Sequence, residues 1–178
     1  MRVLLDVDTG TDDAVAIMLA ALHPGLELAA VTTVSGNVPV ANATENSLRV
    51  LEYIGRTSIP VYAGAAEPLA RPARPGAPGH RNASRIHGDY LDLPPATGAP
   101  VDGIAALAIL AEFRDTGETV LVATGPLTNV ALALKLDPGL ARRIRTLVIM
   151  GGSHAIANVT PSAVRCTSRR CEKKAPCV

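Results

Sequence analysis

The chain has 178 residues, of which 48% are apolar, 2% aromatic and 19% charged, and its formal net charge is +1. This length suffices for one sizeable core, and the scarcity of aromatic residues makes that core aliphatic. A charge so close to zero offers no basic field for nucleic acid, and no apolar run approaches the roughly 18 residues that a membrane span needs. We therefore expect a domain that binds neither nucleic acid nor membrane.

Apolar segments alternate with amphipathic ones along most of the chain. Strands are predicted at 2–7, 26–34, 59–63, 119–123 and 145–150, the last of them buried, and helices at 12–23, 40–55, 101–114 and 129–135. The helix at 40–55 has a polar face formed by Asn42, Glu45, Asn46 and Arg49. Residues 64–100 are rich in Pro, Gly and Arg and form a long loop. This alternation is typical of a single α/β domain with a parallel sheet.

The strongest chemical signal is a cluster of acids at the first junction of strand and helix. Four aspartates lie within eight residues there: Asp6, Asp8, Asp12 and Asp13. Carboxylates a few Å apart repel one another, so a fold that keeps all four is expected to place a cation among them. Oxygen ligands of this kind suit Ca²⁺ or Mg²⁺ better than Zn²⁺ or Cu²⁺.

The spacing of these acids indicates which can share an ion. Side chains alternate along a strand, so Asp6 and Asp8 are predicted to point the same way, with Asp8 nearer the strand's carboxyl end. Gly10 supplies the turn, and Asp12 and Asp13 open the helix, where the first turn favours anions. The alternative is a capped helix with solvated acids and no metal.

Five segments, in order, resemble the inosine/uridine-preferring nucleoside hydrolases. The first is Asp6-Val-Asp8-Thr-Gly10-Thr-Asp12-Asp13-Ala14, similar to the family signature Asp-x-Asp-Pro-Gly-x-Asp-Asp-Ala, with Thr9 where proline is commonest. The others are Thr-Val-Ser-Gly-Asn37, Ile86-His87-Gly88, Ala-Thr124-Gly-Pro-Leu-Thr-Asn129, and Val-Ile-Met150-Gly-Gly-Ser followed by Asn158-Val-Thr-Pro161. The resemblance covers about residues 2 to 163 and implies a Rossmann-like open, mostly parallel sheet with helices on both faces.

The resemblance also implies a reaction, the Ca²⁺-dependent hydrolysis of the N-glycosidic bond of ribonucleosides. By this resemblance Asp8 is both metal ligand and general base, Asp13 is a second ligand, and Thr124 is a third through its backbone carbonyl. The resemblance also implies that four residues contact the ribose hydroxyls or line the pocket around the ribose: Asp12, Asn37, Met150 and Asn158. Asp6 is expected to support these ligands by hydrogen bonds rather than to bind the ion.

Several of these residues also have a purely structural interpretation. Asn37 could be a turn residue, Thr124 a strand end and Met150 part of the core. His87 could be a pocket residue, but a lone loop histidine is usually solvated, so we leave it out of the catalytic set. Asn129 is interpreted as a helix cap.

The composition changes at residue 164. Residues 164–178 contain five basic residues, one acid and all three cysteines of the chain, without helical or strand periodicity. We therefore divide the chain into an incomplete hydrolase-like domain at 1–163 and a disordered tail at 164–178. The cysteine spacing does not fit paired zinc ligands, and a frameshift or other interruption explains the tail better than a zinc knuckle or a basic interaction arm.

The family pattern continues beyond this point with an asparagine, a histidine beside the leaving base and a further metal-binding aspartate that have no counterpart here. We therefore predict weak Ca²⁺ binding, little hydrolase activity and poor solubility, because the pattern implies missing ligands and an open sheet edge. Turnover of inosine or uridine near that of a full-length relative would contradict this. Relatives commonly form homodimers or homotetramers.

Two other interpretations remain open. Leu5-Asp6-Val7-Asp8 resembles the motif of haloacid dehalogenase-type phosphatases, in which Asp6 would be the nucleophile, Asp8 the acid/base and Mg²⁺ the cofactor. A noncatalytic remnant that uses its tail for contacts is the third. We expect a cytoplasmic location, because Asp6 interrupts the first apolar run too early for a signal peptide and residues 1–165 contain no cysteine.

Overall fold

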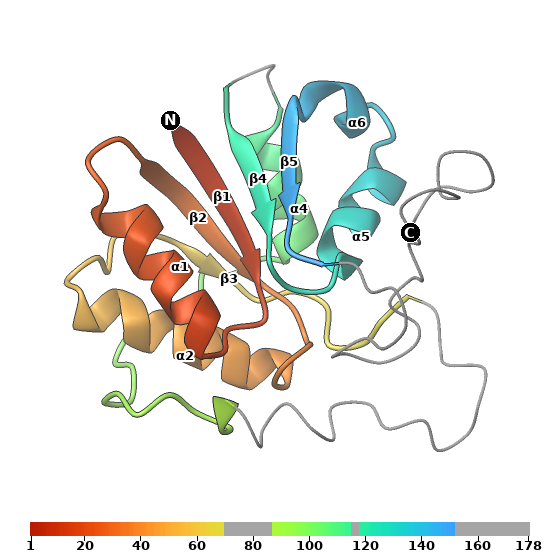
Figure 1. Ribbon diagram of the computed structural model, residues 1–178. Helices are drawn as coiled ribbons and strands as arrows, with labels where there is room; N and C mark the ends of the chain where they lie inside the picture. Colours follow the sequence, from red (N-terminus) through yellow and green to blue (C-terminus); the bar gives the residue numbers. More distant parts are fainter. Residues whose placement is uncertain (70–86, 115–117, 152–178) are drawn as a thin grey trace, which may run out of the picture.

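The computed structural model describes residues 1–69, 87–114 and 118–151, which form a parallel five-stranded sheet with helices on both faces (Figure 1). The strand order is β3-β2-β1-β4-β5. The strands are β1 (Arg2–Val7), β2 (Glu27–Thr33), β3 (Val61–Tyr62), β4 (Val120–Ala123) and β5 (Thr146–Ile149). The helices are α1 (Thr11–Leu22), α2 (Val40–Tyr53), α4 (Ala105–Glu112), α5 (Thr128–Leu136) and α6 (Leu140–Arg143). This architecture confirms the predicted α/β class and the open parallel sheet.

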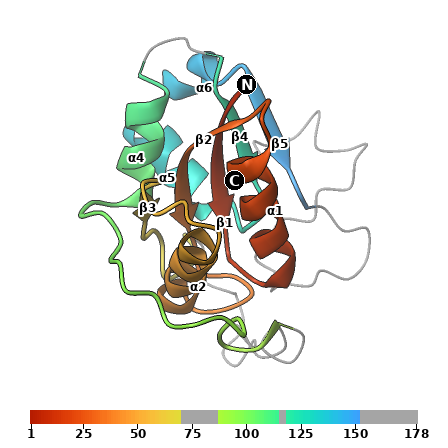
Figure 2. The ribbon, with the colours of Figure 1, turned by 90° about the vertical axis from the view of Figure 1, so that its left-hand side faces the viewer.

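Two apolar layers cover the two faces of the sheet. Alternation along β1 sends Val3, Leu5 and Val7 into the layer formed with α1 and α2, and Leu4 into the layer formed with α4 and α5. Figure 2 shows α1 and the pair α4 and α5 on opposite sides of the strands. The central strand β1 is therefore buried on both faces, which explains why its sequence reads as a continuous apolar run.

Most predicted elements lie within a few residues of their observed bounds, and three differ. The helix predicted at 101–114 spans only Ala105–Glu112, and the strand predicted at 59–63 spans Val61–Tyr62. The short helix α6 was not predicted; it follows Pro138-Gly139, which pattern analysis treats as a breaker.

The prediction that the strand at 145–150 is buried was wrong. All four residues of β5 are exposed, and β5 is the edge strand of the sheet as far as the described residues go. A continuous apolar run indicates a strand that could be buried on both faces, but it carries no information on which elements cover it.

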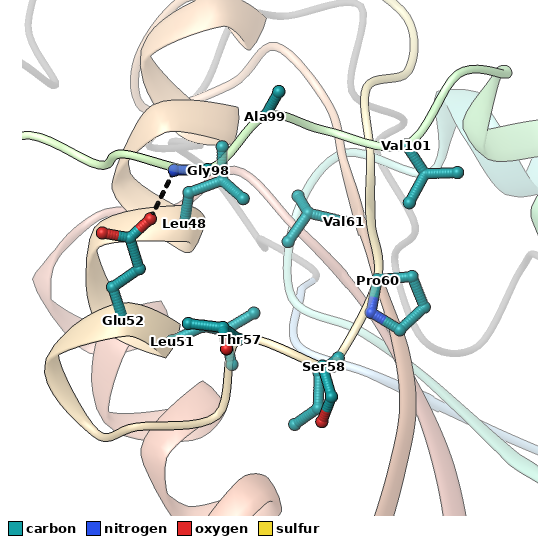
Figure 3. Close-up of a pocket in the computed structure, with 11 residues that line it drawn as sticks. Leu48, Leu51, Glu52, Thr57, Ser58, Pro60, Val61, Gly98, Ala99 and Val101 are labelled. Atoms are coloured by element: carbon teal, nitrogen blue, oxygen red, sulfur yellow. Dashed lines mark hydrogen bonds between the residues drawn. The ribbon is translucent and has the colours of Figure 1, made fainter.

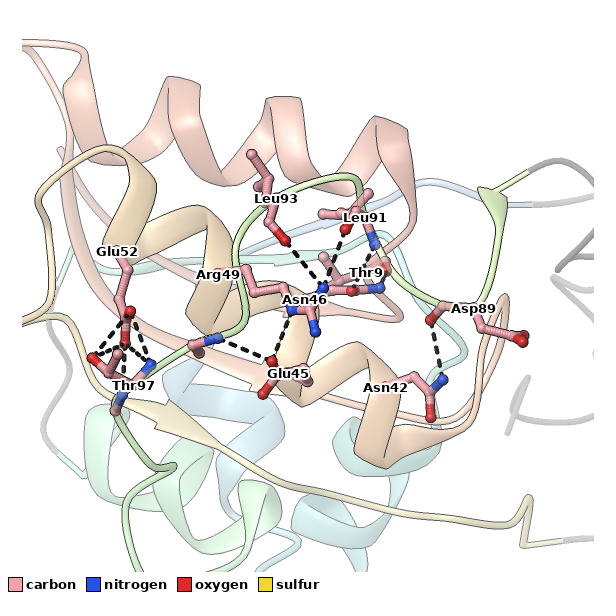
Figure 4. A network of polar contacts seen from close by, with 12 residues as sticks. Thr9, Asn42, Glu45, Asn46, Arg49, Glu52, Asp89, Leu91, Leu93 and Thr97 are labelled. Atoms are coloured by element: carbon pink, nitrogen blue, oxygen red, sulfur yellow. Dashed lines mark hydrogen bonds and ion pairs between the residues drawn. The ribbon is translucent and has the colours of Figure 1, made fainter.

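Part of the predicted long loop is held against α2. Residues 89–98 run along the polar face of this helix, as Figure 4 shows. Asn42 donates to the carbonyl of Asp89, and Arg49 donates to those of Leu91 and Leu93. Further along, Glu52 accepts from the backbone amides of Thr97 and Gly98. The polar face predicted for this helix therefore binds the chain's own backbone.

Candidate active site

The predicted site residues gather at the carboxyl ends of β1, β2 and β4. Asp8 follows β1, Asp13 lies in the first turn of α1, Asn37 follows β2 and Thr124 follows β4. Parallel strands end at the same edge of a sheet, so segments more than a hundred residues apart in sequence meet there. The side-chain hydroxyl of Thr124, for example, contacts Asp13.

Asp8 and Asp13 are the buried acids at the centre of this edge, being 2% and 1% exposed. One oxygen of Asp8, Oδ2, accepts a hydrogen bond from the backbone amide of Asn37 at 2.6 Å. Its other oxygen, Oδ1, is buried and has no hydrogen-bond partner. Asp13 accepts from the Thr124 hydroxyl at 2.5 Å and from the Gly10 amide at 3.1 Å.

Burial makes both carboxylates costly to ionise. Burial, and after it the charge of Asp13, raises the pKa of Asp8 to about 7. Burial likewise raises the pKa of Asp13 above its ordinary value. A buried pair with an unpaired oxygen is unfavourable as two anions, and a cation beside it would remove the penalty.

Gly36 explains how the backbone approaches Asp8 so closely. A Cβ atom at this position would lie 2.1 Å from Oδ2 of Asp8, so any other residue would displace the carboxylate. The glycine before Asn37 in the predicted motif therefore has a steric reason: it allows the Asn37 amide to reach the acid.

Asp6 is fully buried on the face of the sheet that carries α5. Its Oδ1 accepts from the Thr32 hydroxyl at 2.7 Å and from Nδ2 of Asn129 at 2.8 Å, and its Oδ2 has no partner. Burial raises the pKa of Asp6 to about 6, against the lowering effect of these two donors. Asp8 lies one residue beyond β1, and the two acids have different partners. The side-chain bonds of Asp6 go to Thr32 and Asn129 rather than to the predicted ligands, so its supporting role stays a prediction.

Asn129 is not the helix cap that the sequence predicted. It lies inside α5, fully buried, and the N-cap residue of this helix is Leu127. Its amide nitrogen donates to Asp6 and to the carbonyl of Thr33, and its Oδ1 accepts from the backbone amide of Ala65. Asn129 thus joins β1, the end of β2 and the chain after β3 behind the site.

Asp12 and Asn37, the residues expected near the ribose, are more accessible than the buried acids. The side chain of Asp12 is 50% exposed and lies 3.9 Å from Nδ1 of His87, measured from its Oδ1. That nitrogen of His87 also lies 3.0 Å from the Thr11 hydroxyl. His87 is only 16% exposed, so the expectation of a solvated loop histidine was wrong: it covers the amino end of α1.

The other predicted site residues lie around this edge. Thr124 is half-buried, and the contact that the structure shows for its side chain is the hydroxyl bond to Asp13. Met150 follows β5 and is 53% exposed, so it is not a core residue. Asn158 and the predicted tail at 164–178 lie outside the described residues.

The donor set at this edge consists of oxygen atoms. Within residues 1–69, 87–114 and 118–151, no three His, Cys, Asp or Glu side chains converge as a metal cluster. Asp8 and Asp13 nevertheless supply two carboxylates, one of them with a buried, unpartnered oxygen. These residues fit part of the shell of a hard cation such as Ca²⁺, which takes six to eight oxygens.

Two neighbouring α2 residues that the sequence did not single out for the site contact the loop after Asp8. Nδ2 of Asn46 donates to the carbonyl of Thr9, and the hydroxyl of Ser47 pairs with that of Thr9. Asn46 was predicted only as part of a polar helix face. Both contacts span nearly forty residues of sequence, so no local sequence pattern could predict them.

A separate cavity of about 160 Å³ lies between the end of α2 and the chain before β3. Figure 3 shows that mostly apolar side chains line it and that the Glu52 carboxylate is already bound to the Gly98 amide. It belongs to the opposite end of the sheet from Asp8, since Thr57, Ser58 and Pro60 precede β3. We assign it no role.

The arrangement disfavours the phosphatase interpretation. A phosphorylated aspartate must reach its substrate, but Asp6 is fully buried and its Oδ1 is held by Thr32 and Asn129.

In the part of the chain that the structure describes, no helix is long and apolar enough to cross a membrane.

Comparison with known proteins gives one consistent family. The profile of the family described as inosine-uridine preferring nucleoside hydrolase matches residues 3–164. The chain is 38% identical over 169 residues to the inosine-uridine preferring nucleoside hydrolase of Leishmania major, covering 91% of this chain and 52% of that protein. It is 45% identical over 168 residues to the non-specific ribonucleoside hydrolase RihC of Escherichia coli, covering 92% and 53%.

Solved structures agree with the sequence relatives. The purine-preferring ribonucleoside hydrolase from Gardnerella vaginalis superposes with a TM-score of 0.77 at 32% identity, covering 86% of this chain and 49% of that one. An inosine-guanosine nucleoside hydrolase gives a TM-score of 0.75 at 35% identity, covering 89% and 50%. The chain thus spans about half the length of the relatives it matches.

Proposed function

Because this chain belongs to the inosine-uridine preferring nucleoside hydrolase family, we propose that its Asp8–Asp13 site serves the hydrolysis of the N-glycosidic bond of ribonucleosides, giving ribose and a free base. The observation that carries the proposal is the buried, unpartnered Oδ1 of Asp8 beside a second buried acid. Buried acids with perturbed pKa values at the carboxyl edge of a parallel sheet are the groups expected at a catalytic site.

The cofactor that we propose is Ca²⁺. Asp8 and Asp13 would hold it through carboxylate oxygens, and Thr124 through its backbone carbonyl. When bound, the ion would acidify a water and fix sugar hydroxyls. The described residues provide two carboxylates for this role, so we expect an affinity on the order of millimolar, at the weak end of protein calcium sites.

Asp8 is the residue that we propose as general base. Without metal, burial and the charge of Asp13 raise the pKa of Asp8 to about 7. A bound cation would lower this pKa and keep the carboxylate ionised, as a base must be to accept a proton. The amide of Asn37 fixes one of its oxygens, so the carboxylate is oriented before substrate arrives. Its second oxygen has no protein partner, so it can face the cation and the water that the cation would hold.

The residues that we propose for ribose binding are the accessible ones. Asp12 would accept hydrogen bonds from the ribose 2′ and 3′ hydroxyls, and Asn37 would accept from or donate to them. The pocket around the sugar would be lined by Met150 and Asn158. Asp12 and Met150 are both about half exposed, so a small ligand can reach them. We take the substrate class to be ribonucleosides in general, because the relatives are named for different bases.

A cytoplasmic location and assembly as a homodimer or homotetramer also belong to this proposal. Both come from the sequence and its family resemblance, and size-exclusion chromatography with light scattering would test the assembly.

The test is to follow inosine and uridine with this chain by proton NMR, in Ca²⁺ and in chelator. We expect Ca²⁺-dependent shifts of the Asp8 and Asn37 amide signals on adding nucleoside, and slow release of free base that Asp8→Asn abolishes. Nucleoside that neither shifts these signals nor loses its base in Ca²⁺ would overturn the proposal. Phosphate release from p-nitrophenyl phosphate without base release would favour the phosphatase.

A further inference from the structure

The loop that carries Asp8 is anchored on α2. We propose that Asn46 and Ser47, called here the α2 anchor, are positioning residues for the Asp8–Asp13 site and act through Thr9. This inference rests on the proposed function, and it assigns these residues no contact with substrate.

The first anchor is a hydrogen bond between two fully buried hydroxyls. Oγ1 of Thr9 lies 2.7 Å from Oγ of Ser47. Ser47 also donates to the carbonyl of Ala43 at 2.8 Å, which uses its one hydroxyl hydrogen. The Thr9 hydroxyl is therefore the donor in its hydrogen bond with Ser47.

The second anchor holds the backbone of the same residue. Nδ2 of Asn46, whose side chain is buried, donates to the carbonyl of Thr9 at 3.0 Å. Oδ1 of Asn46 accepts from the amide of Leu91 at 3.0 Å. Figure 4 shows Asn46 between Thr9 and Leu91. Two adjacent residues of α2 thus hold Thr9 by its side chain and its main chain.

Thr9 stands between the groups that form the site. Asp8 precedes it, and Gly10, which follows it, donates its amide to Oδ2 of Asp13. A shift of Thr9 would therefore move one proposed ligand and release a donor from the other. Proline, which is commonest here in the family signature, restricts φ by its ring. Threonine has no ring, and in this chain two buried hydrogen bonds restrain the residue instead.

The test compares Thr9→Val and Ser47→Ala with a matched control, Thr44→Val. Thr44 is also a buried α2 residue whose hydroxyl donates to the carbonyl four residues earlier, at 2.7 Å, and pairs with another hydroxyl, that of Thr33, at 2.7 Å. It differs in holding the end of β2 rather than the loop after Asp8. Thr9→Ser keeps the hydroxyl and serves as the conservative variant.

Two quantities are measured on the full chain: amide hydrogen exchange of residues 8–13 without metal, and the Ca²⁺ dissociation constant by NMR titration. We expect Thr9→Val and Ser47→Ala to speed exchange in this loop and to weaken Ca²⁺ binding about tenfold. This is the low end of the cost of losing a group that hydrogen-bonds a metal ligand, because Thr9 acts on Asp8 and Asp13 only through the backbone. Thr9→Ser should restore both values. Thr44→Val should change neither, although it should lower the melting temperature, as Thr9→Val and Ser47→Ala should.

The outcomes separate this inference from the proposed function. Unchanged loop exchange and unchanged affinity in Thr9→Val would overturn the α2 anchor even if the parent chain binds Ca²⁺ well. An equal loss of affinity in Thr44→Val would also overturn it, by showing that any loss of a buried α2 hydroxyl has the same effect. A parent chain that binds no Ca²⁺ would contradict the proposed metal, while loop exchange would still decide whether the bond between Thr9 and Ser47 orders the loop.

Discussion

The charged side chains at the two ends of β1 differ in exposure and in pairing. At the amino end, Arg2 forms ion pairs with Glu27 and Glu112, and its side chain is 42% exposed. At the carboxyl end, Asp6 and Asp8 are buried, and each keeps one oxygen without a partner. Exposed pairs satisfy one another and contribute little to stability. Buried, unsatisfied acids destabilise a fold unless something binds them, and this contrast supports our proposal that the site lies at the carboxyl end.

The largest effect separating the two ends should be on metal affinity. We expect Asp8→Asn to weaken Ca²⁺ binding about 100-fold or more, beyond the usual cost of losing an outer-shell partner, because it removes a charged ligand. Glu27→Gln, the matched acid-to-amide change at the other end of the sheet, should leave the affinity unchanged. NMR titration of both variants decides it, and equal affinities would refute the assignment.

Next in size is the loss of the bonds behind the site. Asn129→Ala leaves Oδ1 of Asp6 and the carbonyl of Thr33 each without one donor. Because these acceptors are buried, we expect the free energy of unfolding to fall by about 2–3 kcal/mol. Urea denaturation measures this, and a loss no larger than that of an exposed ion pair would show that Asn129 does not support Asp6.

The pH dependence of stability should differ between the two ends. The pKa values of Asp6 and Asp8 are raised from 3.8 to about 6 and about 7, so the folded state holds these protons more tightly than the unfolded state. The metal-free chain should therefore be most stable below about pH 4 with respect to these groups, and should lose stability progressively as the pH rises through the raised pKa values of about 6 and about 7.

Asp6→Asn should remove the part of this decline that Asp6 contributes and leave the part that comes from Asp8, since the amide oxygen still accepts from Thr32 and Asn129. Glu27→Gln should not change it. Melting temperatures recorded across the pH range in chelator provide the measurement, and a parent chain that becomes more stable between about pH 4 and pH 7 would contradict the raised pKa values of these acids.

The smallest effect belongs to the amino end itself. Arg2→Met removes the pairs with Glu27 and Glu112 but keeps an unbranched side chain. We expect a loss of less than about 1 kcal/mol, reduced further by salt. A loss as large as that of Asn129→Ala in urea denaturation would mean that the exposed charges matter as much as the buried ones.

The acidic cluster could be predicted from the sequence because its geometry is local. Asp8 and Asp13 lie five residues apart at one strand–helix junction, and such a junction in a parallel sheet always faces the carboxyl edge. The order of strands and helices follows from the alternation of apolar and amphipathic segments in the same way.

The remaining features depend on contacts that no local pattern contains. Asn129 was taken for a cap because it follows Thr128 near a helix start, yet its partner Asp6 lies 123 residues away. The bond between Thr9 and Ser47 spans 38 residues. The exposure of β5 depends on what covers it, which its own apolar sequence cannot specify.

The most direct test of the account is the number of protons released when Ca²⁺ binds, measured with a pH indicator in weakly buffered solution. If Asp8, with its pKa of about 7, is a ligand, binding must displace its proton. We predict release of about one proton per Ca²⁺ near pH 6 and almost none near pH 9, with no release in Asp8→Asn. Binding without proton release near pH 6 would contradict the central claim that Ca²⁺ replaces a proton on Asp8.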